Sequence, residues 1–303
     1  MNKYQAKKKL QIQIYKEYNK IIKNFETTYK KLKRNKKLTK SLTDYKSFDY
    51  SNINMILHDI AHNNTIFFDF NNNSIKEMNK NNKTLSLDKF INNKYNNITT
   101  TIINIDKAIN MSITKKPCIV YRGIHNKSLI SQLKKSEKEG IFTNYSYTST
   151  SLDLDVALGF TISMKKKKIK EGHKYIINKK SQRYLMEIEI PKNTNLLYLP
   201  WEITNPTNKN LKQEKIKGSE FELLLPRGAI YKFISKREQK FIPQRPTWKN
   251  LNNNKKISYY IYKLKLVGFK ENIIPNADEY KNKELKINPE TYKNLLFIGK
   301  NNN

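Results

Sequence analysis

Two carboxylates in the segment 218–228 stand at a spacing that could serve catalysis. The segment reads Gly-Ser-Glu-Phe-Glu-Leu-Leu-Leu-Pro-Arg-Gly, so apolar residues alternate with others before a Pro-Arg-Gly turn. This pattern predicts a strand. Residues i and i+2 of a strand share a face, so Glu220 and Glu222 are expected to point the same way, with Phe221 and Leu223 toward the core. The pair could do acid–base work, or it could form the polar outer face of an amphipathic strand.

An arginine and a glycine end another predicted strand. Residues 117–124 read Pro-Cys-Ile-Val-Tyr-Arg-Gly-Ile, which places Arg122 and Gly123 at the strand exit. An arginine at such an exit can hold a phosphate through two parallel hydrogen bonds, and a neighbouring glycine lets a ligand come close. The alternative is an arginine paired with a carboxylate.

Three hydroxyl residues lie where residues 145–160 run from a predicted strand into a predicted helix. Ser149, Thr150 and Ser151 end the strand, and two aspartates suit the first turn of the helix. Hydroxyls at such a place can serve as caps and turns, or they can orient a carboxylate or a sugar.

Composition limits the chemistry. The single cysteine, Cys118, excludes an internal disulfide and a site with several cysteine ligands. His58 and His62 are four residues apart and would share a helix face, but no third ligand accompanies them, so we expect no metal. No apolar run is long enough to span a membrane, and no secretory signal precedes the lysines of the N-terminus. We therefore expect the protein to act inside a cell, in the host cytoplasm if it is viral or an injected effector.

The formal net charge of +33 indicates an anionic partner such as an acidic protein, a lipid surface or nucleic acid. A duller explanation is codon bias, because lysine, asparagine and isoleucine all have A/T-rich codons. Most of the basic residues are lysines, so an arginine is more informative about a functional need for its fork of donors. The six arginines are Arg34, Arg122, Arg183, Arg227, Arg237 and Arg245.

Helical patterns precede strand patterns along the chain, which favours an α+β class over a parallel α/β sheet. Apolar residues recur at steps of three and four in residues 8–34, which predicts a basic helix. We expect this helix to dock on the catalytic domain; binding to a membrane surface or to nucleic acid is the alternative. The expected divisions are a basic N-terminal helix in 1–43, a catalytic domain in 44–270 with a helical lobe in 44–112 and a β core in 113–270, and a polar tail in 271–303.

The three motifs stand in the order of a known enzyme group. They are Tyr121-Arg122-Gly123, Ser149-Thr150-Ser151 and Glu220-Phe221-Glu222. With them, residues 95–270 resemble the ADP-ribosyltransferases of the arginine–serine–glutamate group, which includes catalytic chains of clostridial binary toxins, C3-like exoenzymes and vertebrate ecto-enzymes. The resemblance implies a small helical N-terminal lobe packed on a mixed, mostly antiparallel core of two sheets.

The resemblance also implies roles for individual residues. The catalytic residues would be Glu222, Glu220 and Ser149, with Ser149 holding Glu222 in place and Glu220 indicating an arginine acceptor. The residues that bind NAD would be Arg122 at the phosphates or ribose, Phe160 near the nicotinamide, Arg183 as a second phosphate contact, and Gly123, Thr150 and Ser151.

The implied function is mono-ADP-ribosyl transfer from NAD to a protein arginine, with release of nicotinamide and without a metal. We expect a monomer that meets a protein acceptor and, through its N-terminal helix, an acidic partner or nucleic acid. Residues 200–217 would carry target recognition. Arginine-modifying toxins tend to have an aromatic residue just before the glutamate pair, where this chain has Ile216-Lys217-Gly218-Ser219. The alternatives are an NAD glycohydrolase and a catalytically degenerate, basic nucleic-acid-binding protein.

Overall fold

The computed structural model describes residues 16–46, 50–62, 67–68, 87–162, 164–169, 172–177, 182–200, 220–242, 256–271 and 286–287. The chain forms two compact units. One comprises Met1–Asn35 with Ala108–Lys270, and the other comprises Lys36–Lys107 with Glu271–Asn303. The predicted site residues all belong to the first unit.

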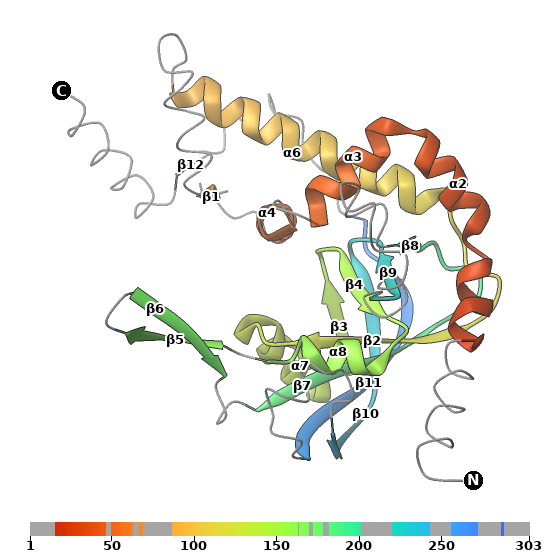
Figure 1. Cartoon of the computed structure of the whole chain (residues 1–303), viewed down its shortest axis with the longest axis vertical. Coiled ribbons are helices and arrows are strands. Elements are labelled where there is room, and N and C mark those ends of the chain that lie inside the picture. Colours follow the sequence, from red (N-terminus) through yellow and green to blue (C-terminus); the bar gives the residue numbers. More distant parts are fainter. Residues whose placement is uncertain are drawn as a thin grey trace. The chain divides into compact units, whose positions relative to one another are not determined.

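The first unit is built on one eight-stranded sheet with the strand order β3-β10-β11-β7-β2-β4-β9-β8 (Figure 1). Its strands are β2 (Cys118–Ile124), β3 (Ile141–Asn144), β4 (Thr148–Ser151), β7 (Arg183–Ile190), β8 (Leu197–Leu199), β9 (Glu222–Leu225), β10 (Ala229–Phe241) and β11 (Ile257–Phe269). Only the neighbours β11 and β7 are parallel, so the sheet is mixed and mostly antiparallel, as expected.

The expected division into two sheets is not confirmed. Strands β2 and β4 join the two halves through the single registered pair Tyr121 and Ser151, and this one link makes the sheet continuous. The lysine-rich run after residue 163 forms a separate antiparallel pair, β5 (Met164–Ile169) and β6 (Gly172–Ile177).

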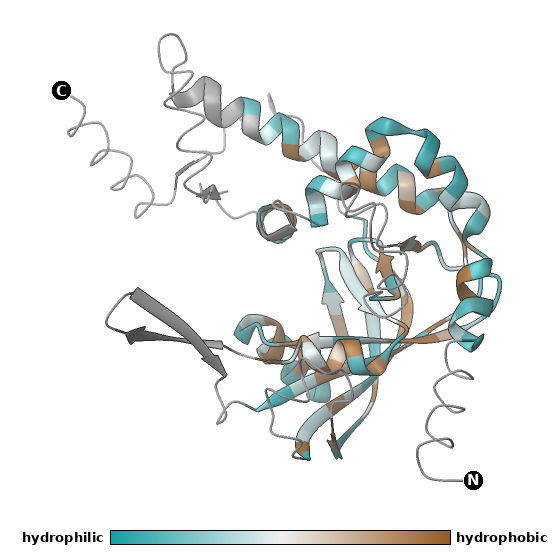
Figure 2. Ribbon diagram, viewed as in Figure 1, coloured by the Kyte–Doolittle hydropathy of each residue, from teal (hydrophilic) through white to brown (hydrophobic). Residues whose placement is uncertain are grey.

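Helices cover both faces of the eight-stranded sheet. On one face α7 (Lys127–Glu139) contributes Leu133 to the main hydrophobic core. On the other face α8 (Leu154–Gly159) packs Ala157 and Leu158 against residues of β7 and β11. Figure 2 shows brown, apolar stretches along strands of this sheet. Strand β9 departs from the predicted alternation, because all four of its residues are buried and the strand is therefore covered on both faces.

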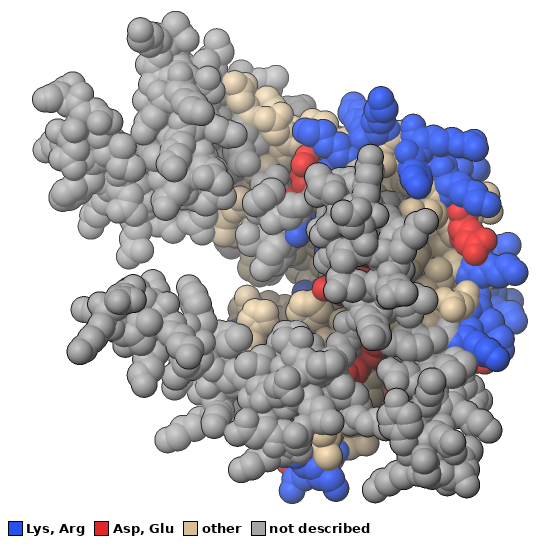
Figure 3. Space-filling view, in the orientation of Figure 1, with Lys and Arg blue, Asp and Glu red and all other residues tan. Residues whose placement is uncertain are grey.

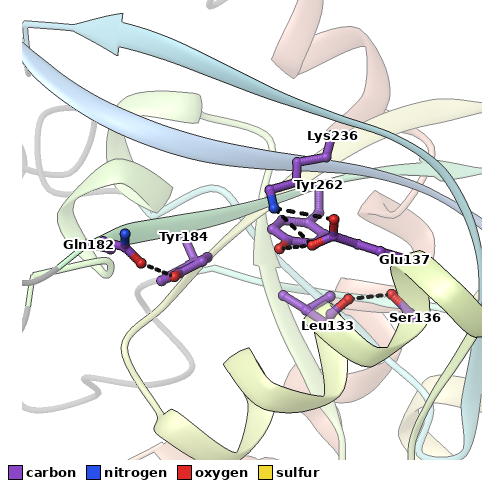
Figure 4. Close-up of polar contacts among 7 residues, drawn as sticks. All are labelled: Leu133, Ser136, Glu137, Gln182, Tyr184, Lys236 and Tyr262. Atoms are coloured by element: carbon purple, nitrogen blue, oxygen red, sulfur yellow. Dashed lines mark hydrogen bonds and ion pairs between the residues drawn. The ribbon is translucent and has the colours of Figure 1, made fainter.

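A polar cluster fastens α7 to the sheet (Figure 4). The carboxylate of Glu137 accepts hydrogen bonds from Tyr262 Oη at 2.5 Å and from Lys236 Nζ at 2.9 Å. Burial acts to raise the pKa of Glu137, but these two hydrogen bonds and the lysine charge outweigh burial and lower it. Burial and the nearby Glu137 carboxylate raise the pKa of Tyr262.

The N-terminal segment is docked, as expected, but it is not one straight helix. Residues 16–23 are helical, a turn follows at Asn24 and Phe25, and α2 (Glu26–Arg34) then begins. The Phe25 ring is buried in the main core, and Tyr18 packs against the same core. The exposed cations of α2 lie on the side of the helix that faces away from this core (blue in Figure 3). Residues 8–15 of the predicted helix lie outside the described residues.

The second unit is helical where it is described. It contains α3 (Lys36–Asp44), α4 (Tyr50–Ala61) and most of α6 (Leu87–Asn110), and a short parallel pair, β1 (Phe67–Phe68) with β12 (Lys286–Ile287). Ile98, Ile102 and Ile105 recur at helical spacing and are buried on one face of α6. Among the described residues, no helix combines the length and the apolarity needed to cross a bilayer. Most of the tail predicted in 271–303 lies outside the described residues.

Candidate active site

Glu222 is the first residue of β9 and is almost wholly buried, with 3% of its surface exposed. The hydroxyl of Ser149 on β4 donates a hydrogen bond to Glu222 Oε1 at 2.5 Å. The sequence predicted this contact from two motifs that lie far apart in the chain. A hydrogen bond from a fixed donor holds a buried carboxylate in one direction, which is the geometry that an electrostatic catalyst needs.

Thr150 and Ser151 are buried, and both hydroxyls contact the backbone around β9. Thr150 Oγ1 donates to the carbonyl of Leu223 at 2.6 Å, and Ser151 Oγ donates to the carbonyl of Glu220 at 2.5 Å. These bonds add to the antiparallel ladder between β4 and β9. Both residues therefore help to hold the strand that carries Glu222, and their contact with NAD stays a prediction.

Arg122 lies where β2 and β4 meet. One of its guanidinium nitrogens donates to the carbonyl of Ser149 at 3.3 Å. In the part of the chain that the structure describes, no carboxylate lies within ion-pair distance of Arg122, so the alternative of an arginine–carboxylate pair is not observed there. A guanidinium carries five N–H donors, so one bond to a carbonyl leaves donors for a bidentate contact with a phosphate.

A buried tyrosine network lies beside Arg122, and sequence reasoning missed it. Tyr231 Oη donates to Thr148 Oγ1 at 3.0 Å, and Asn144 Nδ2 donates to the same oxygen at 2.7 Å. Burial raises the pKa of Tyr231 to about 12, although the hydrogen bond with Thr148 and the positive charge of Arg122 act against burial. The phenol therefore stays protonated and keeps its donor bond to the first residue of β4.

Gly123 makes room for the end of α8. A Cβ atom at this position would lie 2.0 Å from the carbonyl oxygen of Ala157 and 2.9 Å from the backbone carbon of Phe160. The backbone of Phe160 is therefore held against the exit of β2, and the Phe160 residue is 48% exposed there. An exposed ring at this exit can stack on a flat ligand, as the nicotinamide assignment requires.

His125 also holds Phe160, and the sequence analysis did not select it. Its Nδ1 lies 3.1 Å from the carbonyl oxygen of Phe160, which can accept a hydrogen bond from this nitrogen. The chain has only four histidines, and this one stands two residues after Gly123. Its position after the arginine–glycine motif is the signal that could have found it.

Arg183 is the first residue of β7 and contacts Tyr259 on β11. It is 5% exposed, donates to Tyr259 Oη at 3.2 Å and lies over the same ring at 5.7 Å from its centroid. Burial raises the pKa of Tyr259, and the charge of Arg183 opposes this rise. Arg183 thus joins β7 to β11 in the face that α8 covers, and its contact with a phosphate stays a prediction.

The two glutamates are not consecutive outward residues of one regular strand. Strand β9 begins at Glu222, and Phe221 has a φ of 45°, in the left-handed region. A bulky residue there costs roughly 1–3 kcal/mol of strain. The expected alternation therefore stops at Glu222, and the half-buried Glu220 precedes a left-handed residue that the sequence pattern did not predict.

Two further expectations concern the target-recognition segment and the possible metal site at His58 and His62. Residues 201–219, which include nearly all of the expected recognition segment, lie outside the described residues. His58 and His62 stack with their ring centroids 4.2 Å apart. Within the described ranges, no cluster of three or more His, Cys, Asp or Glu side chains could hold a metal ion.

Comparison with protein families gives one match over most of the chain. The family described as "ADP-ribosyltransferase exoenzyme" matches residues 22–263, a range that contains every predicted site residue. Among curated proteins, no significant match is found.

Several solved structures have a similar course of the chain. The enzymatic component C2-I of the C2 toxin from Clostridium botulinum has 13% identity and a TM-score of 0.48, over 84% of this chain and 47% of that chain. This chain thus spans about half the length of C2-I. Plx2a, an ADP-ribosyltransferase toxin from Paenibacillus larvae, has 18% identity and a TM-score of 0.43, over 83% and 97%. C3stau2 from S. aureus, solved with NAD, has 16% identity and a TM-score of 0.44, over 86% and 96%.

Proposed function

Since the chain belongs to the ADP-ribosyltransferase exoenzyme family, and so to the enzymes that transfer ADP-ribose from NAD, we propose that its acceptor is a protein arginine and that nicotinamide is released. One observation carries the proposal. The buried carboxylate of Glu222 is held by Ser149 at 2.5 Å, beside an arginine that has no carboxylate partner among the described residues. These groups are of the kinds that the reaction needs, which supports the proposal.

Cleavage of NAD depends on Glu222. The bond between ribose C1′ and the nicotinamide nitrogen breaks, its electron pair leaves with nicotinamide, and positive charge develops on the sugar, as in glycoside cleavage. A carboxylate that is already fixed stabilises this charge without reorganising, and such pre-aimed electrostatics is commonly the largest catalytic contribution. The bond from Ser149 supports this role, because it fixes the carboxylate before NAD arrives.

Transfer depends on Glu220. A guanidine nitrogen of the acceptor forms the new bond to C1′ and loses one proton. Arginine is protonated under ordinary conditions, so a base must take this proton before the nitrogen can attack. Glu220 is half-buried, so its carboxylate can both reach an acceptor in solvent and take the proton.

The remaining groups fit the NAD molecule. The free donors of Arg122 suit a diphosphate, and the exposed ring of Phe160 suits the flat nicotinamide. His125 and Gly123 keep the Phe160 backbone at the exit of β2. This scheme uses no metal, because the Glu222 carboxylate meets the positive charge that develops on the ribose and the Arg122 guanidinium meets the negative charge that the diphosphate already carries.

The direct test is incubation of the full chain with NAD that carries label in its ADP-ribose part, together with a cell lysate and, separately, with agmatine as an arginine mimic. We expect nicotinamide release, labelled protein and labelled agmatine. Nicotinamide release without any labelled acceptor would identify an NAD glycohydrolase instead. Labelled protein without labelled agmatine would keep the transferase but exclude arginine as the preferred acceptor.

A further inference from the structure

The residue between the two glutamates has an unusual backbone. Phe221 has a φ of 45°, which a bulky side chain rarely adopts, and β9 begins only at the next residue. Glu220 is thereby separated from β9 by a left-handed residue. The direction of the Glu220 carboxylate depends on the left-handed backbone of Phe221, called here the Phe221 turn, and not on the alternation of the strand.

Two hydrogen bonds from the end of β4 hold the turn. Ser151 Oγ donates to the carbonyl of Glu220 at 2.5 Å, and the N–H of Leu152 donates to the carbonyl of Phe221 at 3.1 Å. The same strand carries Ser149, which orients Glu222. The turn and the buried carboxylate are therefore attached to one strand.

The Phe221 side chain is held from the opposite end of the sequence. Its ring is 5% exposed and belongs to the main core. The ring of Tyr18, in the helical segment 16–23, lies 5.2 Å from it between centroids, at an interplanar angle of 53°. A tilted pair at this separation is a favourable aromatic arrangement. A ring that is anchored in this way prevents the backbone of Phe221 from relaxing toward negative φ.

We propose that Phe221 and Tyr18 are positioning residues that set the carboxylate of Glu220 relative to that of Glu222. The inference rests on the proposed function, because it assigns a cause to the spacing of the two carboxylates. If the ring is released, the backbone returns to the extended form and Glu220 moves toward the regular strand position. Transfer then suffers, while cleavage through Glu222 continues.

The first test compares three variants of the full chain: Tyr18→Ala, Tyr18→Phe and, as a matched control, Ile22→Ala, whose side chain packs on the same core from the same segment. Transfer is measured as label in lysate protein and cleavage as nicotinamide release. Misplacing a catalytic group by about 1 Å can cost up to roughly a hundredfold, so we expect Tyr18→Ala to lower the ratio of transfer to cleavage about tenfold. Tyr18→Phe and Ile22→Ala should keep the parental ratio. A parental ratio in Tyr18→Ala, with only a Tm loss like that of Ile22→Ala, would overturn the proposal.

A glycine variant separates the ring from the backbone. Phe221→Gly can adopt a positive φ without strain but has no ring to anchor. We expect its ratio of transfer to cleavage to fall as that of Tyr18→Ala does. A parental ratio would show that the left-handed backbone suffices and that the ring has no positioning role.

Amide hydrogen exchange supplies a readout that needs no activity. The Leu152 amide, which bonds to the Phe221 carbonyl, should exchange faster in Tyr18→Ala, whereas amides in the β2–β7 ladder should keep their protection. Unchanged protection of the Leu152 amide would contradict the proposal that Tyr18 anchors the ring of Phe221. A parent protein that releases no nicotinamide would defeat the proposed function, and the exchange experiment would still decide on the anchor.

Discussion

Ser149 and Glu222 are joined diagonally across the β4–β9 ladder. Ser149 stands opposite Leu224 and Glu222 opposite Ser151, yet the hydroxyl of Ser149 reaches Glu222 Oε1 at 2.5 Å. The two side chains share a face of the sheet because each is two residues from the other's direct partner. This bond fixes the buried carboxylate of Glu222 to β4. The same strand accepts the hydrogen bond from Arg122 through the carbonyl of Ser149.

Replacing Glu222 by glutamine should abolish cleavage and transfer while NAD still binds. Glutamine keeps the shape but cannot offer a negative charge to the developing cation, so nicotinamide release should fall at least about a hundredfold. Nicotinamide release and a binding isotherm measure the two effects. The control is Glu189→Gln on β7, a half-exposed residue paired with Lys263, which should keep parental activity. Near-normal hydrolysis in Glu222→Gln would sink the assignment.

Replacing Arg122 by lysine should weaken NAD binding. Lysine keeps the charge but loses the planar fork of donors, so the Kd for NAD should rise roughly tenfold or more. Titration calorimetry with NAD measures this change. Arg237→Lys, at an exposed ion pair with Glu187, is the matched control and should leave the Kd unchanged. An unchanged isotherm for Arg122→Lys would assign Arg122 a structural role.

Replacing Glu220 by glutamine should separate the two half-reactions. Water can still take the place of the acceptor, so much of the nicotinamide release should remain, but agmatine labelling should be largely lost because no base draws the proton from the guanidinium. Both products are measured on the same sample. Equal loss of both would mean that Glu220 supports cleavage itself, and labelling at the parental rate would remove its acceptor role.

Alkaline pH should destabilise the protein partly through Tyr231. Its pKa is about 12 in the fold and near 10 in the unfolded chain, so the folded state holds the proton more tightly. The resulting stability is complete below pH 10 and is lost as the pH rises toward 12, at up to ~1.4 kcal/mol per pH unit for one proton. Tyr231→Phe should reduce this slope and cost about 1 kcal/mol at neutral pH through the lost bond to Thr148. Urea unfolding at several pH values measures both, and a parental slope in the variant would contradict the prediction.

The motif-bearing strands could be predicted from the sequence because their signals are local. Alternation, the Pro-Arg-Gly turn and the hydroxyls before α8 all lie within a few residues of the elements that they define. The contact of Ser149 with Glu222 followed from the order of the motifs in a known family and not from spacing. The identity of the site residues was therefore more accessible than their exact geometry.

The features that could not be predicted depend on distant contacts. The turn at Phe25 forms because its ring enters a core built by strands far along the chain, and both flanking segments would also suit one helix. Leu152 and Tyr18 stabilise the left-handed backbone of Phe221. Tyr259 stabilises the buried Arg183 through a hydrogen bond. The docked Tyr18 also changes the expectation for the N-terminal helix: removing residues 1–34 uncovers part of the main core, so we expect loss of folding as well as of basic charge.

The order of the strands in the sheet determines at what point of synthesis the sheet can be completed. Strand β11, the last long strand described, lies in the interior of the sheet between β10 and β7. A nascent chain that has not yet released residues 257–269 from the ribosome leaves the inner edge of β7 unpaired and the main core open. Non-local pairing of this kind makes assembly slow and late. The chain therefore stays inert until residues 257–269 have left the ribosome, and catalytic competence arises only when β11 enters the sheet.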